Sequence, residues 1–287
     1  MLSRDVREEV AAFAQELAAE SGALAVLFYG SNLRTGSLEG VLDFYILLPG
    51  KQQERIWPRV AYHEREHEGM TLRAKTATMS LAKFAQAACG DSRDTTIWTR
   101  FVQPSALVFA KDEAARDAVV SAIESAARTA ARFAAVLGPD EGRASDYWKA
   151  LFQATYRAEF RVEKAGRENA ILEANPQHFD GLLRSAWDAD GLPYEVSDEI
   201  LRPKLPAAAK TRIARQWAQR ERLGKSLNIA RLAKATTTFE GAARYGAWKL
   251  ERHTGIALEV TPFREKHPLL AMPGAAWELW RARRDQR

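Results

Sequence analysis

Cysteine and clustered histidine are nearly absent from this sequence. Its 287 residues include one cysteine, Cys89, so no disulfide can join two parts of the chain. The five histidines are scattered apart from His63 and His67, and no group of cysteine and histidine has the spacing of a zinc site. These absences exclude a disulfide-held fold and indicate a reducing compartment.

Long apolar runs are also missing. No stretch of about eighteen apolar residues occurs, so we expect no helix that spans a bilayer. Residues 1–10 lack the basic start and apolar centre of a secretory signal. The chain is 46% hydrophobic and 28% charged, a composition that supports a core and excludes a disordered protein. We therefore expect a cytoplasmic protein.

Acidic residues are outnumbered by basic ones. The 42 lysines and arginines exceed the 37 aspartates and glutamates, which gives a net charge of +5. This excess suits an anionic partner, and it leaves open whether that partner is a nucleotide, a nucleic acid or an anionic lipid surface. The length allows two domains or one large domain.

Two apolar runs with a Gly-Ser turn between them form the most informative stretch. Residues 24–29 and 41–48 have the length and character of buried strands, and Gly30 and Ser31 follow the first run directly. The second run carries Asp43, and a carboxylate in a buried strand is costly unless it is paired or binds a metal. An ordinary turn followed by an acid at a sheet edge is the alternative interpretation.

The Gly-Ser turn and the acid together favour a nucleotide site over that alternative. A small hydroxyl beside free backbone N–H groups can bind a phosphate. A carboxylate on the neighbouring strand can hold the Mg²⁺ that bridges such phosphates.

Residues 29–31 with Asp43 resemble the signature of the polymerase-β-like nucleotidyltransferase superfamily, in which a hydrophobe-Gly-Ser turn precedes two acids one residue apart. Tyr45 stands at the second acid position. The mitochondrial-type phosphatidate cytidylyltransferases, which are similar to the translocator assembly and maintenance protein, share this departure. Their strand resembles residues 42–46, and the similarity spans most of residues 20–250.

Three later stretches resemble the same family. Residues 72–75 resemble its lysine-centred strand, and residues 100–104 resemble an Arg…Lys/Gln-Pro segment. Residues 156–161 resemble a Tyr-x-Gly-Asp-Phe-Arg motif, from which Ala158 and Glu159 depart. Each stretch is short, and their common order along the chain is what carries the resemblance.

The resemblance implies an enzyme that uses CTP, Mg²⁺ and phosphatidic acid and makes CDP-diacylglycerol and pyrophosphate. A phosphomonoester is largely ionised at neutral pH, so it needs less help from a base than a hydroxyl does, and the loss of an acid at Tyr45 is tolerable. The implied site residues are Tyr29, Gly30, Ser31 and Arg73 for the nucleotide, Asp43 as metal ligand and catalytic residue with Lys75, and Arg100 and Arg161 for the lipid phosphate.

The polar region 51–69 is predicted to be irregular. His63 and His67 satisfy the spacing of a zinc-protease helix motif, but the segment is charged on every face, and we reject a zinc site. Residues 70–79 are predicted to form a strand with Arg73 and Lys75 on one face. That face is either a solvated edge or, as the resemblance implies, directed at phosphates.

Helical spacing dominates the second half of the chain. We predict helices over 5–20, 80–88, 111–137, 145–165, 179–187, 207–222 and 226–252, a strand-like run over 95–107, and a linker over 188–206. Arg157, Arg161 and Lys164 form a basic stripe, either in solvated ion pairs or at a phosphate site. Trp277, with Trp280 and the arginines after it, fits either a membrane-interface anchor or a docked terminal helix.

The resulting prediction is an α/β (α+β) fold. It comprises a nucleotidyltransferase domain with a mixed sheet over 1–110, a mainly helical domain over 111–255, and a basic amphipathic tail over 256–287. We expect peripheral association with the inner face of a membrane and do not expect nucleic acid as a partner. The alternatives are transfer to another phospholipid-like phosphate, transfer to a soluble or nucleic-acid acceptor, and a non-catalytic nucleotide-binding scaffold.

Overall fold

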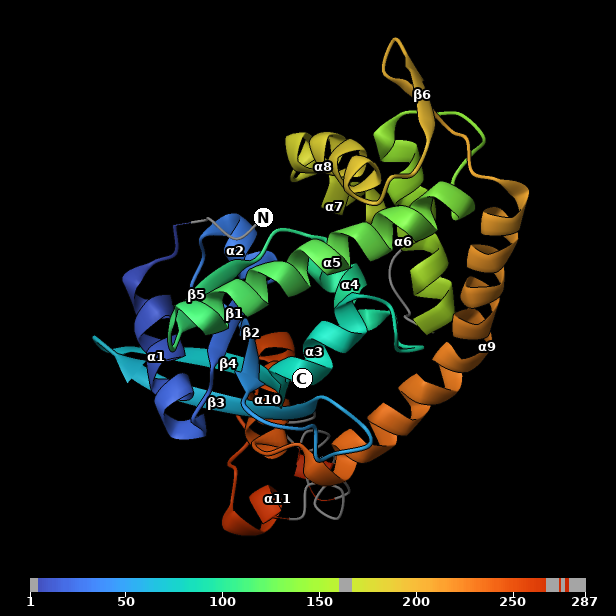
Figure 1. Cartoon of the computed structure of the whole chain (residues 1–287). Coiled ribbons are helices and arrows are strands. Elements are labelled where there is room, and N and C mark those ends of the chain that lie inside the picture. Colours follow the sequence, from blue (N-terminus) through green and yellow to red (C-terminus); the bar gives the residue numbers. More distant parts are fainter. Residues whose placement is uncertain (1–4, 160–166, 267–273, 275–276, 279–287) are drawn as a thin grey trace.

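The computed structural model describes residues 5–159, 167–266, 274 and 277–278. Within these residues the chain is a mixed α/β protein with eleven helices, a five-stranded sheet and a two-stranded hairpin (Figure 1). The strands are β1 (Ala25–Tyr29), β2 (Leu42–Leu48), β3 (Arg59–His67), β4 (Met70–Ser80), β5 (Ala106–Ala110), β6 (Tyr194–Ser197) and β7 (Ile200–Pro203). The helices are α1 (Glu8–Ser21), α2 (Ser31–Thr35), α3 (Leu81–Ala88), α4 (Thr96–Phe101), α5 (Glu113–Leu137), α6 (Ala144–Glu159), α7 (Arg167–Glu173), α8 (Pro176–Ala189), α9 (Ala207–Thr238), α10 (Ala242–Thr254) and α11 (Pro262–Lys266).

The large sheet is mixed, as predicted. Its strand order is β3-β4-β2-β1-β5, and β2 pairs with β4 in parallel while the other neighbours are antiparallel. The chain leaves β2, returns along β3 at the edge, and then inserts β4 beside β2. This route brings two segments far apart in the sequence into direct register at the centre of the sheet.

Helix α1 covers one face of the sheet. Its buried side chains recur at helical spacing at Val10, Phe13 and Leu17, so one apolar stripe faces the strands. Phe13 meets Phe44 of β2 edge to face, with ring centroids 6.1 Å apart. The apolar pattern of residues 5–20 therefore predicts the helix and its buried side correctly.

A larger core fills the opposite face and continues into the helices that follow the sheet. Trp98 of α4 stacks on Phe133 of α5 at 5.3 Å, and Phe133 in turn contacts Trp217 of α9 at 5.7 Å. Tyr45 of β2 and Trp187 of α8 belong to the same buried cluster. One continuous core thus includes residues from both sides of position 110, and the domain boundary placed there stays a prediction.

Several segments differ from the sequence prediction. The polar region expected to be irregular contains strand β3, which pairs with β4 along its whole length. Its edge position lets charged residues occupy both faces. His63 and His67 lie in this strand and not in a helix, in keeping with the rejection of a zinc-protease helix, and His63 Nε2 contacts the Thr76 hydroxyl at 3.1 Å. The run 95–107 is helix α4 followed by β5. Asp94 accepts a hydrogen bond from the backbone N–H of Thr96 at 2.8 Å, and this local turn leads the chain into the helix.

Helix α9 continues through the break expected at residues 223–225, and the helix expected over 226–252 is instead divided between α9 and α10. Helix α9 runs beside α5 and α6 and reaches the edge of the sheet near β3 (Figure 1). Gly224, at the expected break, lies against α6, where an added Cβ would overlap the backbone oxygen of Ala158. Glycine therefore serves close helix contact here and does not end the helix. The expected linker over 188–206 contains the hairpin β6–β7.

The predicted tail is described only in part. Helix α11 is short, Trp277 is 62% exposed, and residues 279–287 lie outside the described residues. In the described parts of the chain, no helix is both long and apolar enough to cross a bilayer. Membrane contact by the tail stays a prediction.

Candidate functional site

A cavity of about 250 Å³ opens beside the central strands, and it gathers most of the predicted site residues. Its sheet side comes from the end of β1, the start of α2, β2 and β4, and helix α4 adds a further wall. The predicted residues that line it are Tyr29, Gly30, Ser31, Asp43, Lys75 and Arg100.

Strand register explains why these residues meet. Tyr29 of β1 pairs with Asp43 of β2, and Asp43 pairs with Lys75 of the parallel strand β4. Because side chains at paired positions point to the same face of a sheet, a carboxylate and an ammonium lie side by side on the cavity face. Tyr62 of β3 continues the row beyond Lys75.

Gly30 brings the turn and the carboxylate into contact. Its φ of 94° and ψ of −160° belong to a region that is essentially restricted to glycine. A Cβ added there would lie 3.1 Å from Asp43 Oδ2, so the glycine also makes room for the carboxylate. Asn32 then fixes the following loop, because its side-chain amide donates to the carbonyls of Ser37 and Glu39 at 2.9 and 2.7 Å.

The electrostatics of the cavity are those of an anion site with one acid. Burial raises the pKa of Asp43, while the nearby charges of Lys75 and Arg100 partly oppose that rise. Arg34 adds a further cation at the exposed rim. Three cations against one carboxylate leave the lining positive, which suits a polyanionic ligand.

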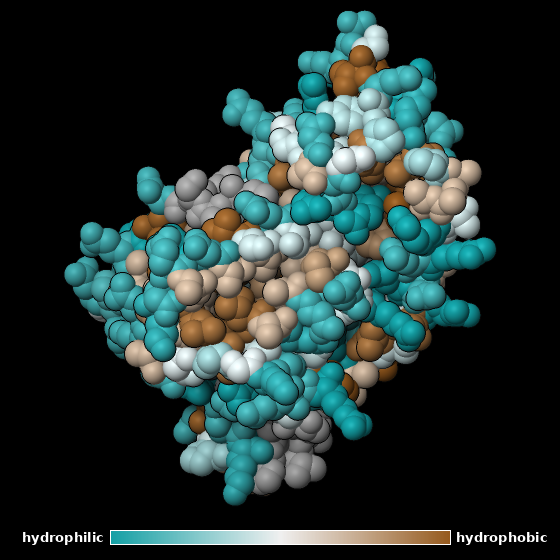
Figure 2. Space-filling model, viewed as in Figure 1, coloured by the Kyte–Doolittle hydropathy of each residue, from teal (hydrophilic) through white to brown (hydrophobic). Residues whose placement is uncertain are grey.

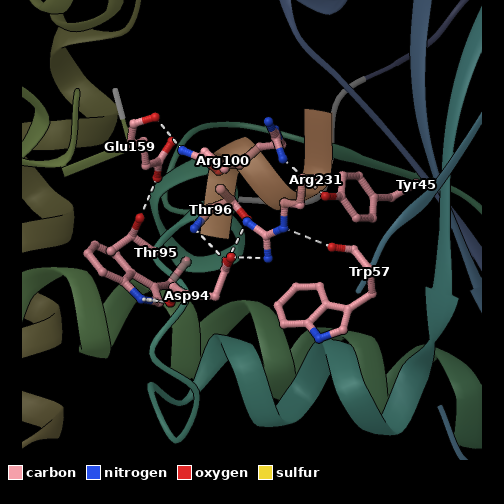
Figure 3. Close-up of polar contacts among 10 residues, drawn as sticks. Tyr45, Trp57, Asp94, Thr95, Thr96, Arg100, Glu159 and Arg231 are labelled. Carbon is pink, nitrogen blue, oxygen red and sulfur yellow. Dashed lines mark hydrogen bonds and ion pairs between the residues drawn. The ribbon is translucent and has the colours of Figure 1, made fainter. Parts of the chain in front are cut away.

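Arg100 is held in place by aromatic residues. Its guanidinium lies 5.3 Å from the ring centre of Tyr29 and 5.6 Å from that of Tyr45, and its Nη1 donates to the Tyr45 hydroxyl at 3.0 Å (Figure 3). Burial opposes the charge of Arg100, but the surrounding tyrosine hydroxyls and the carboxylates of Glu159 and Asp43 raise its pKa, so it stays a cation.

Tyr45 therefore has a structural role at the position of the expected second acid. Its ring is fully buried among Phe84, Phe101 and Tyr29, and burial raises its pKa. Its hydroxyl, at the position where the resemblance places an acid, accepts from Arg100 and orients the cation.

Two predicted residues are not among the residues lining this cavity. Arg73 shares the face of Lys75, as predicted, but its Nε lies 3.4 Å from Glu64 Oε1 and its guanidinium 5.6 Å from the Trp248 ring of α10. Its nucleotide-binding role stays a prediction. Arg161 lies outside the described residues, and so does its predicted role in phosphate binding.

The far wall consists of residues that the sequence analysis did not select. It is uncharged and comes from α4 and from the helices after residue 144: Thr99, Gln103, Pro104, Tyr156, Ile171 and Asn175. Gln103 and Tyr156 lie within stretches that carry the family resemblance, which is the one signal that could have found them. Asn175 had no such signal, since its buried position depends on how α7 and α8 pack.

Asp43 is the one carboxylate among the residues that line the cavity and could bind a metal ion. In the described part of the chain no group of three or more His, Cys, Asp or Glu side chains could hold a metal ion. Asp94, one of the acids nearest the site in sequence, is engaged in an ion pair with Arg231 (Figure 3). Mg²⁺ commonly takes one or two carboxylates and completes its shell with water and substrate phosphates. Asp43 therefore fits an ion that is held largely by a bound polyphosphate.

Taken together, these residues can bind a polyphosphate, neutralise its charge and position a metal at one carboxylate. An uncharged wall faces the charged one, so the cavity can accommodate a ligand with a polar organic part as well as phosphates. No protein-family model matches the chain. A search of curated proteins also finds no match from which a relative could be identified.

Proposed function

We propose that this chain is a nucleotidyltransferase of the polymerase-β-like superfamily that transfers CMP from CTP to a lipid phosphate. By the family resemblance, the acceptor is phosphatidic acid and the products are CDP-diacylglycerol and pyrophosphate. The observation that carries the proposal is the placement of Asp43, which lies against Gly30 at the Gly-Ser turn and beside Lys75 of the parallel strand. The order β1-α2-β2, with β4 parallel to β2, fits the mixed sheet that the resemblance implies.

Each residue has a role in this chemistry. The turn at Gly30 and Ser31 brings backbone N–H groups to the triphosphate, and Lys75 and Arg100 neutralise the charge that develops on phosphate oxygens. Asp43 would hold Mg²⁺, which supplies further charge neutralisation when it is bound. An oxygen of the lipid phosphate bonds to the α-phosphorus, the bond from that phosphorus to the bridging oxygen breaks, and pyrophosphate leaves with the electron pair.

The absence of a second acid is consistent with such an acceptor. A hydroxyl acceptor must lose a proton as it attacks, and a carboxylate near Asp43 would assist that loss. A phosphate monoester is already largely ionised at neutral pH. The site can therefore rely on positioning and charge neutralisation, and Tyr45 is free to orient Arg100.

The direct test is pyrophosphate release from CTP and Mg²⁺ with phosphatidic acid in mixed micelles. We expect release that requires both CTP and the lipid, is lost in Asp43→Asn, and is retained in the exposed control Asp117→Asn. Release with another lipid phosphate or a soluble acceptor would keep the chemistry and change the substrate. No release with any nucleotide and acceptor, from protein shown to be folded, would refute the proposal.

One observation favours a second candidate, a non-catalytic nucleotide-binding protein. Tyr45 occupies the second acid position, and its hydroxyl is bonded to Arg100, so one carboxylate remains in the cavity. This candidate predicts CTP binding that Asp43→Asn weakens, without pyrophosphate release in any mixture. The same pair of proteins in a binding assay and the release assay separates the two functions.

A further inference from the structure

A second cavity, of about 410 Å³, lies away from the candidate transfer site. It is enclosed by the loop between β2 and β3, by α3, by the loop before α4 and by the C-terminal half of α9. Asp94 and Arg231 lie at this cavity, whereas Arg100 at the other end of α4 lines the transfer site, and the two cavities share no lining residue. None of the functions considered above uses this second cavity.

The charge of this cavity is strongly positive. Arg55, Lys83, Arg93 and Arg231 line it, and the one acid, Asp94, is paired with Arg231. Lys83 donates to the neutral amide oxygen of Gln86 at 2.8 Å. Within the described residues, Arg55 and Arg93 form neither an ion pair nor a hydrogen bond. Three cations are thus left without a carboxylate partner.

Apolar side chains lie among these cations. Ile56 and Leu227 line the cavity and are each 38% exposed. Leu223 and the Trp57 ring extend the apolar lining inward. Figure 2 shows that hydrophobic surface on the viewed face occurs in small patches between hydrophilic side chains. A ligand that matches this cavity needs an anionic group joined to a short apolar segment.

The Trp57 ring argues against a nucleotide as that ligand. Lys83 Nζ lies 5.2 Å and the Arg231 guanidinium 4.8 Å from the ring centre, and Trp57 is only 7% exposed, which leaves little of the ring for a base to stack on. The cavity is also held in shape without a ligand, because Arg231 Nε donates to the Trp57 carbonyl at 2.9 Å and Lys234 donates to the Ile56 carbonyl.

We propose that this cavity binds the phosphate headgroup and first acyl methylenes of an anionic phospholipid, and that it holds the protein on a bilayer surface. Arg55 and Arg93 contact the headgroup, because they are the cations without partners. Ile56 and Leu227 contact the acyl methylenes at the open side. The site goes beyond the proposed transfer reaction and does not depend on it.

The test is co-sedimentation of the full chain with vesicles of phosphatidylcholine, with or without phosphatidylglycerol, in the absence of CTP. The double variant Arg55→Gln/Arg93→Gln is compared with Arg212→Gln/Arg215→Gln, which removes the same charge from exposed positions of α9 outside the cavity. We expect Arg55→Gln/Arg93→Gln to weaken binding to anionic vesicles at least about tenfold, because each basic residue at an anionic surface adds to the free energy of binding. Arg212→Gln/Arg215→Gln should change that binding little.

A second variant tests the apolar part, and thermal unfolding shows that each variant is folded. Leu227→Asn is expected to weaken vesicle binding several-fold, and to do so even in salt that screens the charges. Equal losses in the two arginine pairs would mean diffuse charge attraction and overturn the proposal. If glycerol phosphate at matched phosphate concentration releases the protein from the vesicles, the ligand is a soluble phosphate. If the protein instead binds an immobilised acidic peptide through the same residues, the ligand is a protein partner. Either result also overturns the proposal.

The outcome is separable from that of the transfer reaction. Pyrophosphate release with a short-chain, monomeric phosphatidate does not require a bilayer. Arg55→Gln/Arg93→Gln is expected to keep that release while losing vesicle binding. A chain that binds vesicles through this cavity but releases no pyrophosphate would leave the lipid site standing and refute the transfer proposal alone.

Discussion

Replacing Gly30 by alanine tests the geometry of the transfer site most sharply. The backbone at Gly30 has φ 94° and ψ −160°, where a residue with a Cβ is strained by about 1–3 kcal/mol. The new Cβ would also lie 3.1 Å from Asp43 Oδ2, so the carboxylate must move by a few tenths of an ångström. We expect Gly30→Ala to unfold at a lower temperature, by about 2–4 °C for each kcal/mol.

Gly36→Ala is the matched control at the other end of α2. Gly36 also has positive φ, at 67°, but a Cβ there meets nothing within 4 Å. Both variants should lose stability in thermal unfolding, while Gly30→Ala alone should lose CTP affinity, by at least about tenfold, in a calorimetric titration with Mg²⁺. CTP binding by Gly30→Ala at wild-type affinity would show that the contact between Gly30 and Asp43 is not part of a nucleotide site.

Three further predictions concern stability and follow from single contacts. Burial raises the pKa of Asp43 above its ordinary 3.8, so the folded state holds this proton more tightly, and stability falls as the pH rises from 3.8 through the raised pKa of the folded state and is level above it. Asp43→Asn removes that loss, so its advantage over wild type in urea unfolding should grow across that pH range and then level off; the same difference below and above the range would contradict this. Tyr45→Phe removes the hydroxyl that accepts from Arg100 and should cost about 1.5–3 kcal/mol in the free energy of unfolding, measured in urea; an unchanged free energy would contradict this. Gly224→Ala should destabilise the protein by forcing α9 off α6, whereas Gly246→Ala, in open space within α10, should stabilise it by about 0.5–1 kcal/mol, and thermal unfolding showing the same sign for both would refute the close helix contact.

The parts of the fold that the sequence predicts well are those with a single dominant local pattern. Continuous apolar runs identify β1 and β2, and the spacing of apolar residues identifies α1 and α5. Strand β3 escaped prediction because it lies at the sheet edge and carries charge on both faces, which leaves no apolar alternation. Helix α4 was mistaken for a strand because Ile97 and Trp98 favour strands, a preference that the local turn closed by the hydrogen bond from the Thr96 N–H to Asp94 opposes.

The residues of the candidate site also fall into those that local sequence predicts and those that it does not. The turn and the acid are close together in the sequence, so a short sequence motif identifies Gly30, Ser31 and Asp43. The place of Lys75 depends on the parallel pairing of β2 with β4, which local pattern cannot specify, and the family resemblance supplied it. Asn175 reaches the cavity through the packing of helices beyond residue 144, and no local pattern marks it.

The way α9 is attached has a consequence for local unfolding. Its N-terminal half buries Ile213 and Trp217, but beyond Arg220 none of its described side chains is buried. That second half is held instead by polar contacts: the ion pairs of Arg231 with Asp94 and of Lys234 with Glu54, and hydrogen bonds from side chains to backbone carbonyls, such as Asn228 to Glu159. Detaching it exposes little apolar surface, so residues 221–238 should open as a separate unit, and their amide hydrogens should exchange with solvent well before those of the core and faster as salt is added.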